Sequence, residues 1–318
     1  MRREDTPQRD PRQENWAFGR PPVMHRLTRR STELDSTPYP DSLERRTRPR
    51  APLHFKRIEL KYFIPDRLIP YVLERLAAYT VVDPYLVKEG RGRNWYPVTS
   101  LYFDSYDLQA YDEKADGLLL RRKIRLRTYE MEFSPRAPAF MEIKRRLDAV
   151  VLKDRLALGA AIDDTGPPSR LLPHLLDICE DKESKTYQEA RMIAHWLNLQ
   201  PTALVRYRRV AYVGRDDPKT RVTIDVDLQA GWKPPYVCGD IPMRSIGSVT
   251  AQGTDAISGR YGMLELKCDN MVPAWFHEAL QDLELRRTAY SKYFLAVTTL
   301  IPRVSEDCIP HFTKGGKS

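Results

Sequence analysis

The chain has 318 residues, of which 42% are hydrophobic and 30% are charged, so it can bury a sizeable core as one large or two ordinary domains. Its 52 lysines and arginines outnumber its 43 aspartates and glutamates, and the formal charge of +9 favours polyanionic partners such as nucleotides, polyphosphates, nucleic acid or acidic lipid. Four cysteines without a CxxC pair favour reduced thiols over a disulfide framework or a zinc site, and predict a cytoplasmic protein. No signal peptide is recognisable, and the apolar run at 293–301 is too short to span a bilayer.

Residues 1–50 are rich in Arg, Pro, Asp, Glu, Ser and Thr and have few aliphatic side chains. Such a segment cannot bury enough apolar area to offset its ordering entropy, so we predict a disordered tail. A solvated tail is the favoured interpretation, and a nucleic-acid-binding arm is the alternative.

The folded part is predicted to begin near Leu53. Residues 55–64 alternate as a strand does, with Glu59 and Lys61 on one face. A helix is predicted from Pro65 to about Tyr79, because apolar residues recur there at helical spacing. A strand at 97–105 and an amphipathic segment at 106–117 follow.

A hairpin at 119–146 carries the strongest pattern in the chain. Alternate residues of its first strand are cationic, and its second strand shows a similar charged face, which gives the set Arg121, Lys123, Arg125, Arg127, Glu142, Lys144 and Arg146. Like charges on one sheet face repel each other, so an anionic ligand is expected there. The alternative is an ordinary antiparallel sheet with one hydrated face.

A further strand is predicted at 149–158, with Lys153 and Arg155 on one face. Residues 159–200 are predicted to form a helical insertion with helices at 171–180 and 187–199, the second presenting Met192, Ile193, Trp196 and Leu197 as its apolar face. Strands then return in ALVRYRRVAYVG, TRVTIDVDL and GMLELKC, and helices are predicted near 273–283 and 291–301, before a C-terminal tail at 302–318.

At least five predicted strands share an apolar face opposite a face with Lys or Arg. A sheet that turns the charged face inward and packs helices outside would use both faces, which predicts an α+β fold built on an antiparallel β-barrel tunnel. Enclosed cations are costly unless an anion compensates them, and a phosphate chain meets that need. Glu265 is either a ligand of a hard divalent ion or a structural ion-pair partner, and Glu59 and Glu142 are weaker metal candidates.

Eight short motifs occur in order: ELKY (59–62), TSLYFDS (99–105), KIRLRTY (123–129), MEIKRR (141–146), YRRVAY (207–212), RVTIDVDL (221–228), LELK (264–267) and SKYF (291–294). Together they resemble the VTC domain, the polyphosphate polymerase branch of the triphosphate tunnel metalloenzymes, over about residues 53–301. The resemblance implies a β-barrel tunnel, dependence on Mn²⁺ or Mg²⁺, and transfer of the γ-phosphate of ATP to inorganic polyphosphate or pyrophosphate.

Position by position, the resemblance implies phosphate-contacting cations at Lys61, Lys114, Arg125, Arg127, Lys144, Arg209 and Arg221. It also implies phosphate-site roles for Tyr207, Ser291 and Lys292 and a metal-binding role for Glu265, and the lumen-facing pattern adds Lys123 and Lys267. Ser291 has a second interpretation, since serine is a favoured helix N-cap and a helix N-terminus attracts phosphate.

One departure bears on the reaction. Hydrolases of the superfamily resemble one another in an ExExK pattern on the first strand, where this chain has Arg57, Glu59 and Lys61. The missing carboxylate favours transfer to phosphate over transfer to water. Three alternatives remain open: a tunnel triphosphatase, a non-catalytic polyphosphate-binding or nucleotide-binding module, and a nucleic-acid binder, against which the alternating placement of the cations argues.

Overall fold

The structure is a computed structural model that describes residues 57–147, 150–163, 166–246, 260–269, 271–285, 287–289 and 291–301. The predicted tails at 1–50 and 302–318 lie outside these residues, and the domain boundaries at 53–301 and 159–200 stay predictions. Within the described ranges no helix is long and apolar enough to cross a membrane.

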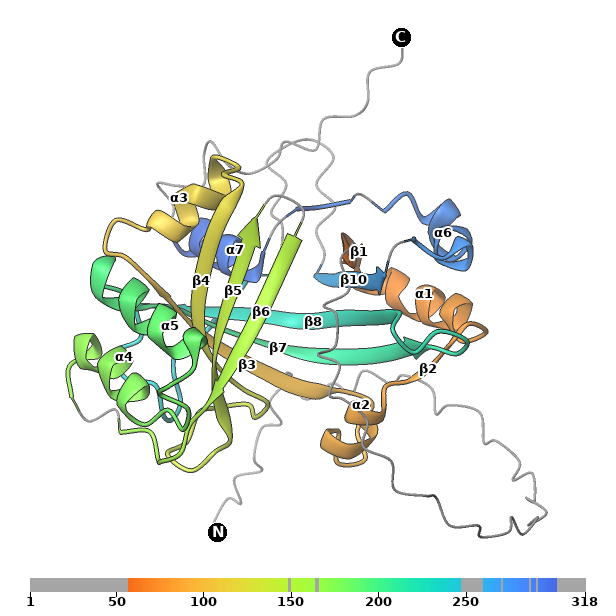
Figure 1. Ribbon diagram of the computed structural model, residues 1–318. Helices are drawn as coiled ribbons and strands as arrows, with labels where there is room; N and C mark the ends of the chain where they lie inside the picture. Colours follow the sequence, from red (N-terminus) through yellow and green to blue (C-terminus); the bar gives the residue numbers. More distant parts are fainter. Residues whose placement is uncertain are drawn as a thin grey trace, which may run out of the picture. The chain divides into compact units, whose positions relative to one another are not determined.

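An antiparallel sheet dominates the molecule (Figure 1). The described residues form the strands β1 (Arg57–Pro65), β2 (Thr80–Val82), β3 (Tyr96–Asp104), β4 (Leu120–Thr128), β5 (Ala139–Leu147), β6 (Val150–Ala157), β7 (Gln200–Gly214), β8 (Arg221–Trp232), β9 (Arg244–Ser245) and β10 (Tyr261–Asp269). Their order across the sheet is β1-β10-β8-β7-β3-β4-β5-β6, with β2 beside β7 and β9 beside β8. In Figure 1, β4, β5 and β6 cross β7 and β8 at a steep angle, so the sheet is strongly bent. The α+β class and the tunnel fold are as predicted.

Seven α-helices accompany the sheet in the part of the chain that the structure describes. They are α1 (Ile69–Leu76), α2 (Pro84–Glu89), α3 (Gln109–Ala115), α4 (Pro168–Asp177), α5 (Lys185–Trp196), α6 (Ala274–Leu280) and α7 (Lys292–Leu300). Short 3₁₀ turns at Asp66–Leu68 and Gln281–Leu283 precede α1 and follow α6.

The apolar face of the hairpin packs against the helical insertion. In the β4–β5 ladder Ile124 is opposite Ile143 and Leu126 is opposite Met141, and all four side chains are buried. They belong to one core cluster that also contains Leu171, Leu172, Leu175 and Leu176 from α4 and Tyr187, Ala190 and Ile193 from α5. The strand alternation therefore separates a helix-covered face from a charged face, as the two-residue period requires.

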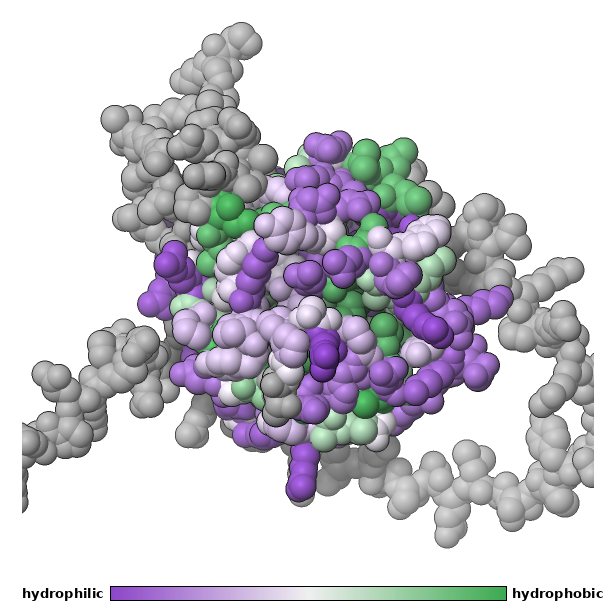
Figure 2. Space-filling view, turned by 90° about the vertical axis from the view of Figure 1, so that its left-hand side faces the viewer, coloured by the Kyte–Doolittle hydropathy of each residue, from purple (hydrophilic) through white to green (hydrophobic). Residues whose placement is uncertain are grey.

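The predicted apolar face of α5 is partly wrong. Ile193 is buried, but Met192 is 45% exposed and Trp196 is 77% exposed, while Tyr187 and Ala190 complete the buried face. Figure 2 shows the side of the molecule that carries α4 and α5, where hydrophilic residues dominate and hydrophobic ones form separate patches. The helix has two apolar stripes, and only tertiary packing determines which of them is covered.

Helix α7 differs from α4 and α5 because it packs on the same face of the sheet as the charged side chains. Its Tyr293 ring lies 5.2 Å from the ring of Tyr102 of β3, and the Tyr293 hydroxyl donates a hydrogen bond to the buried carboxylate of Asp104. Asp104 also accepts hydrogen bonds from the backbone N–H groups of Ser105, Ala110 and Tyr111 at the start of α3. One carboxylate thus fixes both helices against β3.

The described strands do not form a closed hydrogen-bonded cylinder. Strands β1 and β6 are the two ends of the sheet order, and no ladder joins them. An ion pair of 3.7 Å between Glu59 Oε2 of β1 and Lys144 Nζ of β5 connects the two sides instead. The bent sheet therefore surrounds its charged face with a seam that is bridged by side chains.

The expected alternation of β8 fails at its second aspartate. Arg221, Thr223 and Asp225 share a face, but Asp227 has a positive φ of 52° beside a register shift between β7 and β8. Its carboxylate lies 3.5 Å from Arg208 Nε. Such a bulge re-aims one side chain, so Asp227, which strict alternation along TRVTIDVDL places on the charged face with Asp225, leaves that face.

Candidate active site

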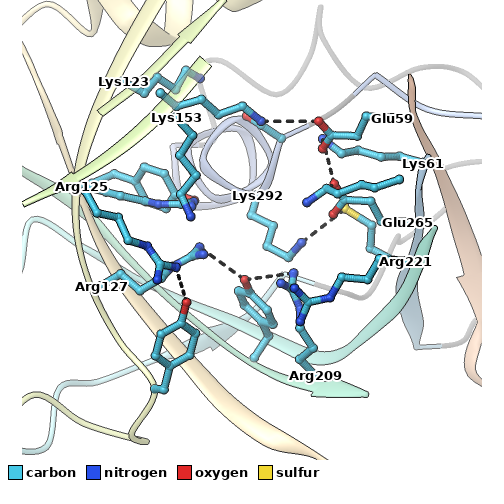
Figure 3. A pocket seen from close by; sticks show the side chains of 18 of the residues that line it. Glu59, Lys61, Lys123, Arg125, Arg127, Lys153, Arg209, Arg221, Glu265 and Lys292 are labelled. Carbon is cyan, nitrogen blue, oxygen red and sulfur yellow. Dashed lines mark hydrogen bonds and ion pairs between the residues drawn. The ribbon is translucent and has the colours of Figure 1, made fainter. Parts of the chain in front are cut away.

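The bent sheet and the N-terminal end of α7 enclose a cavity of about 340 Å³. Eleven lysine and arginine side chains line it: Lys61, Lys123, Arg125, Arg127, Lys144, Lys153, Arg155, Arg209, Arg221, Lys267 and Lys292. The other lining residues are Glu59, Tyr85, Tyr96, Tyr102, Tyr129, Tyr207, Met263, Glu265 and Ser291. Figure 3 shows the labelled side chains converging on one space from opposite walls, with α7 behind them.

Glu142 joins the cations of the β4–β5–β6 wall. Its carboxylate is 1% exposed and lies 2.7 Å from Arg125 Nη2 and 2.6 Å from both Lys153 Nζ and Arg155 Nε. Burial by itself would raise the pKa of Glu142, but these cations and Arg127 hold it well below its usual range. Glu142 is therefore ionised, and its oxygens are already shared among its neighbours.

Asp225 has the corresponding place on the β7–β8 wall. It accepts two hydrogen bonds from Arg209, from Nε at 2.6 Å and from Nη2 at 2.8 Å, and lies 2.5 Å from Lys292 Nζ. The carboxylate is fully buried, yet Arg209 and Lys292 keep its pKa below the usual value. Asp225 therefore holds the Arg209 guanidinium through two hydrogen bonds and keeps Lys292, the first residue of α7, beside the cavity.

The β1–β10 wall carries the two glutamates that line the cavity. Lys61 Nζ lies 2.8 Å from Glu59 and 3.9 Å from Glu265, and Lys267 Nζ lies 3.2 Å from Glu265. Burial opposes ionisation of Glu265, but Lys267 and Lys61 hold its pKa well below the usual range. The strand pairing explains the arrangement, because Lys61 is opposite Glu265 and Glu59 is opposite Lys267.

Three lining lysines are held in unfavourable surroundings for a charge. Burial lowers the pKa of Lys123 to about 7, of Lys144 to about 8 and of Lys153 to about 7. The ammonium of Lys123 is buried without a hydrogen-bond partner and lies 4.8 Å from the centre of the Tyr293 ring. Such groups favour an anionic ligand, because the ligand charge restores the stability of the protonated form.

Carboxylates do not balance the cations of the cavity. Counting Glu59, Glu265, Asp83, which lies 2.7 Å from Arg221, and the buried Glu142, Asp225 and Asp104, the last of which acts on Lys123, six carboxylates stand against eleven cationic side chains. Enclosed cations in excess favour an anionic ligand. The size of the cavity suits several phosphate groups and their counter-ions rather than a nucleic-acid duplex.

Most of the predicted site residues come together here. Lys61, Lys123, Arg125, Arg127, Lys144, Tyr207, Arg209, Arg221, Lys267, Ser291, Lys292, Glu59 and Glu265 all line the cavity. Glu142 lies behind the lining, as a partner of the cations. Lys114 does not line it: this residue lies on α3, and its ammonium is 6.0 Å from the centre of the Phe294 ring.

Several lining residues were absent from the predicted site. Lys153 and Arg155 were visible as one face of a strand, and the ladder places them opposite Lys144 and Glu142. Tyr102 follows the alternation of β3, and its ring lines the cavity. Its hydroxyl accepts a 2.9 Å hydrogen bond from Arg125. Tyr85 lies on a short helix and gave no periodic signal, whereas Tyr129 directly follows β4 at the next alternate position after Arg127.

The carboxylates suit a hard divalent ion only in part. No group of three or more His, Cys, Asp or Glu side chains able to hold a metal occurs within the described residues. Glu59 and Glu265 would supply oxygen ligands, and the hydroxyl of Thr223, opposite Glu265 in the ladder, is buried without a partner. Mg²⁺ is commonly bound through one or two carboxylates with substrate phosphates and water, so this donor set fits such an ion together with its phosphate ligand.

A bent antiparallel sheet around a cation-lined cavity is the tunnel fold that the sequence predicted. The sequence model of the VTC domain matches residues 56–301. The chain belongs to the VTC domain family.

Solved structures with a similar fold come from distant proteins. A candidate adenylate cyclase from Bacillus halodurans is 11% identical, with 74% of this chain and 95% of that chain covered and a TM-score of 0.39. A candidate adenylyl cyclase from Hippeastrum, described as having a dominant triphosphatase activity, is 12% identical, with 82% and 100% covered and a TM-score of 0.43. No curated protein matches the chain.

Proposed function

We propose that the protein is an ATP-dependent polyphosphate polymerase, which transfers the γ-phosphate of ATP to inorganic polyphosphate or pyrophosphate within the cavity. The observation that carries the proposal is the enclosed excess of cations on several strands around a space of about 340 Å³. Membership of the VTC domain family supports the choice of reaction.

Arg125, Arg127, Arg209 and Arg221 form the triphosphate clamp. Arg127 donates hydrogen bonds to Ser100 Oγ at 3.0 Å and to the Tyr207 hydroxyl at 3.4 Å, and Arg209 donates to the same hydroxyl at 3.4 Å. The Tyr207 hydroxyl thus holds guanidinium groups from two different strands in one arrangement; the two arginines, Arg127 and Arg209, are labelled in Figure 3. Fixed donors around a transferring phosphoryl group stabilise the charge of the transition state without reorganisation.

Lys61, Lys144 and Lys292 guide the acceptor chain. An ammonium group is a point charge without a preferred direction, so it can follow a phosphate chain as the chain moves. Lys123 and Lys267 extend this path along β4 and β10. Ser291 caps α7 by accepting a 3.2 Å hydrogen bond from Phe294 N, which leaves its hydroxyl proton for a phosphate oxygen.

The metal ion is a proposal that rests on Glu265, with Glu59 beside it. A bound Mn²⁺ or Mg²⁺ would neutralise phosphate charge and help to orient the transferring group. Lys61 forms ion pairs with both carboxylates, so its positive charge would partly offset the negative charge that they offer to the metal ion.

The acceptor needs no general base. The attacking oxygen of a phosphate chain is already anionic near neutral pH, unlike a water molecule or a hydroxyl group. No histidine is among the residues that line the cavity. This favours transfer to phosphate over hydrolysis, the alternative reaction.

Incubation of the full chain with ATP and Mn²⁺ or Mg²⁺ separates the two reactions. A polymerase yields long chains on a gel, whereas a triphosphatase yields free phosphate. We expect Arg125→Ala and Glu265→Gln to abolish synthesis while the fold is retained. Arg122→Ala is the matched control, because Arg122 is on the same strand as Arg125 but is exposed and pairs with Glu189 at 3.4 Å. Retained synthesis in either cavity variant would contradict the assignment.

A further inference from the structure

Three tyrosines form an aromatic wall on one side of the cavity. Tyr85 of α2, Tyr96 of β3 and Tyr129, which follows β4, pack edge to face with ring centres 5.1, 5.2 and 6.0 Å apart. All three line the cavity. Tyr96 is buried at the base of the wall, whereas Tyr85 and Tyr129 are partly exposed.

The aromatic wall is directly attached to the cationic lining. The Tyr129 hydroxyl accepts a hydrogen bond from Arg155, and the Tyr96 hydroxyl accepts one from Arg221 Nη2 at 3.4 Å. Asp83 connects the aromatic wall to the cationic lining. One of its carboxylate oxygens accepts a 2.8 Å hydrogen bond from Tyr85 N, and the other lies 2.7 Å from Arg221. A ligand whose phosphates contact Arg155 and Arg221 is therefore within reach of the tyrosine rings.

The wall lies where the cationic lining becomes more exposed. The side chains of Arg155 and Arg221 are 41% and 35% exposed, whereas those of Arg125 and Arg209 are 16% and 12% exposed. Exposure thus increases from Arg125 and Arg209 toward Arg221 and Arg155, the two arginines that the tyrosine hydroxyls contact. A nucleotide with its triphosphate in the clamp would place its organic part at this end.

Inorganic polyphosphate has no group that gains from an aromatic surface. A nucleobase does, because stacking on an aromatic side chain stabilises any base through its π-face. We propose that Tyr85 and Tyr129 form the aromatic contact surface for the nucleobase of a nucleoside triphosphate; the base stacks on one ring and meets the other at an angle, since the two rings are inclined at 64° to each other. The inference rests on the proposed function and extends it to the part of the donor that is not phosphate.

The same surface does not read the edge of the base. Among the side chains that line the cavity there is no asparagine or glutamine, and the neutral hydrogen-bonding groups are Ser291 and the tyrosines. The Asp83 carboxylate is occupied by Tyr85 N and Arg221. ATP and GTP should therefore bind with dissociation constants within about threefold of each other, since stacking is tolerant of base identity.

Isothermal titration calorimetry of the full chain without divalent metal tests the aromatic contact surface, with ATP, GTP and tripolyphosphate as ligands. For Tyr85→Ala/Tyr129→Ala we expect ATP and GTP binding to weaken about tenfold, the effect of losing one base stack, while tripolyphosphate binding changes less than about threefold. Tyr129→Phe retains the ring and should bind ATP like the wild type. Tyr71→Ala removes an exposed tyrosine of α1 and serves as the control.

Unchanged tripolyphosphate binding also shows that the double variant is folded. Equal weakening of all three ligands, or unchanged ATP binding, would overturn the inference. Failure of the proposed function is distinguishable, because a wild-type protein that makes no polyphosphate from ATP can still show base-dependent binding in the metal-free titration.

Discussion

Replacing Glu142 with glutamine removes the carboxylate that three cations of the β4–β5–β6 wall contact directly. Arg125, Lys153 and Arg155 lie 2.6–2.7 Å from its oxygens, and Arg127 lies 3.8 Å away. A neutral amide can accept fewer hydrogen bonds and cannot offset four positive charges. We expect Glu142→Gln to destabilise the ligand-free protein.

The magnitude follows from burial. Breaking a buried ion pair by removing one partner costs about 3–5 kcal/mol. Lys153 and Arg155 are 36% and 41% exposed and can regain hydration, so the lower end, about 3 kcal/mol, is expected. For a domain of this size that loss lowers Tm by about 6–12 °C.

Urea and thermal unfolding, with and without tripolyphosphate, measure the effect. The anion should stabilise the variant more than the wild type, because its phosphate oxygens replace the missing carboxylate. Since Glu142 has a lowered pKa in the folded protein, wild-type stability should fall as the pH drops below about 4.3, the unfolded value, and this contribution should be absent from the variant.

Glu130→Gln provides the comparison, because Glu130 pairs with Arg91 at the surface, where both side chains are more than one third exposed. Surface pairs contribute about 0–1 kcal/mol. If Glu142→Gln is no more destabilising than Glu130→Gln, the interpretation of Glu142 as the partner of the cationic wall is wrong.

Two further predictions concern protons and the position of α7. Three cavity lysines, Lys123, Lys144 and Lys153, have pKa values lowered to about 7 to 8, and phosphate binding should raise these values. The protein should therefore take up protons when it binds tripolyphosphate at pH 8. Its affinity for tripolyphosphate should fall as the pH rises from 7 to 9. Calorimetry in buffers of different ionisation enthalpy measures the uptake, and a buffer-independent heat would contradict it. Tyr293→Phe removes a hydrogen bond to the buried Asp104 and should cost about 1.5–3 kcal/mol in urea unfolding. Tyr236→Phe, which removes an exposed tyrosine hydroxyl, should cost less than about 1 kcal/mol, and an equal loss in both variants would refute the role of Asp104.

The charged and apolar faces of the strands could be predicted because a two-residue period determines which side chains share a face. Arg125 and Arg127 on β4, and Glu265 and Lys267 on β10, lie on the predicted side for this reason. The same rule fails at Asp227, because a bulge changes the direction of one side chain and leaves no mark in the residue pattern.

The contact between Tyr85 and Tyr129 could not be predicted, because it joins two segments that are distant in the sequence. Tyr85 belongs to a six-residue helix, which is too short to show a period, and Tyr129 follows the end of a strand. Their meeting depends on how the sheet bends. Lys114 was assigned by resemblance alone; it lies on α3 outside the cavity lining, yet its charge is close enough to help lower the pKa of Lys123.

The carboxylates beneath the cationic lining have a kinetic consequence. Arg125 and Arg209 are each paired with a buried acid, so an arriving phosphate shares a donor that is already engaged. The gain in free energy per phosphate is smaller than bare guanidinium groups would give, and the dissociation rate is correspondingly higher. Under the proposed polymerase activity, each phosphate unit would then have a short residence time at any one position, which would allow a long anion to advance along the cavity.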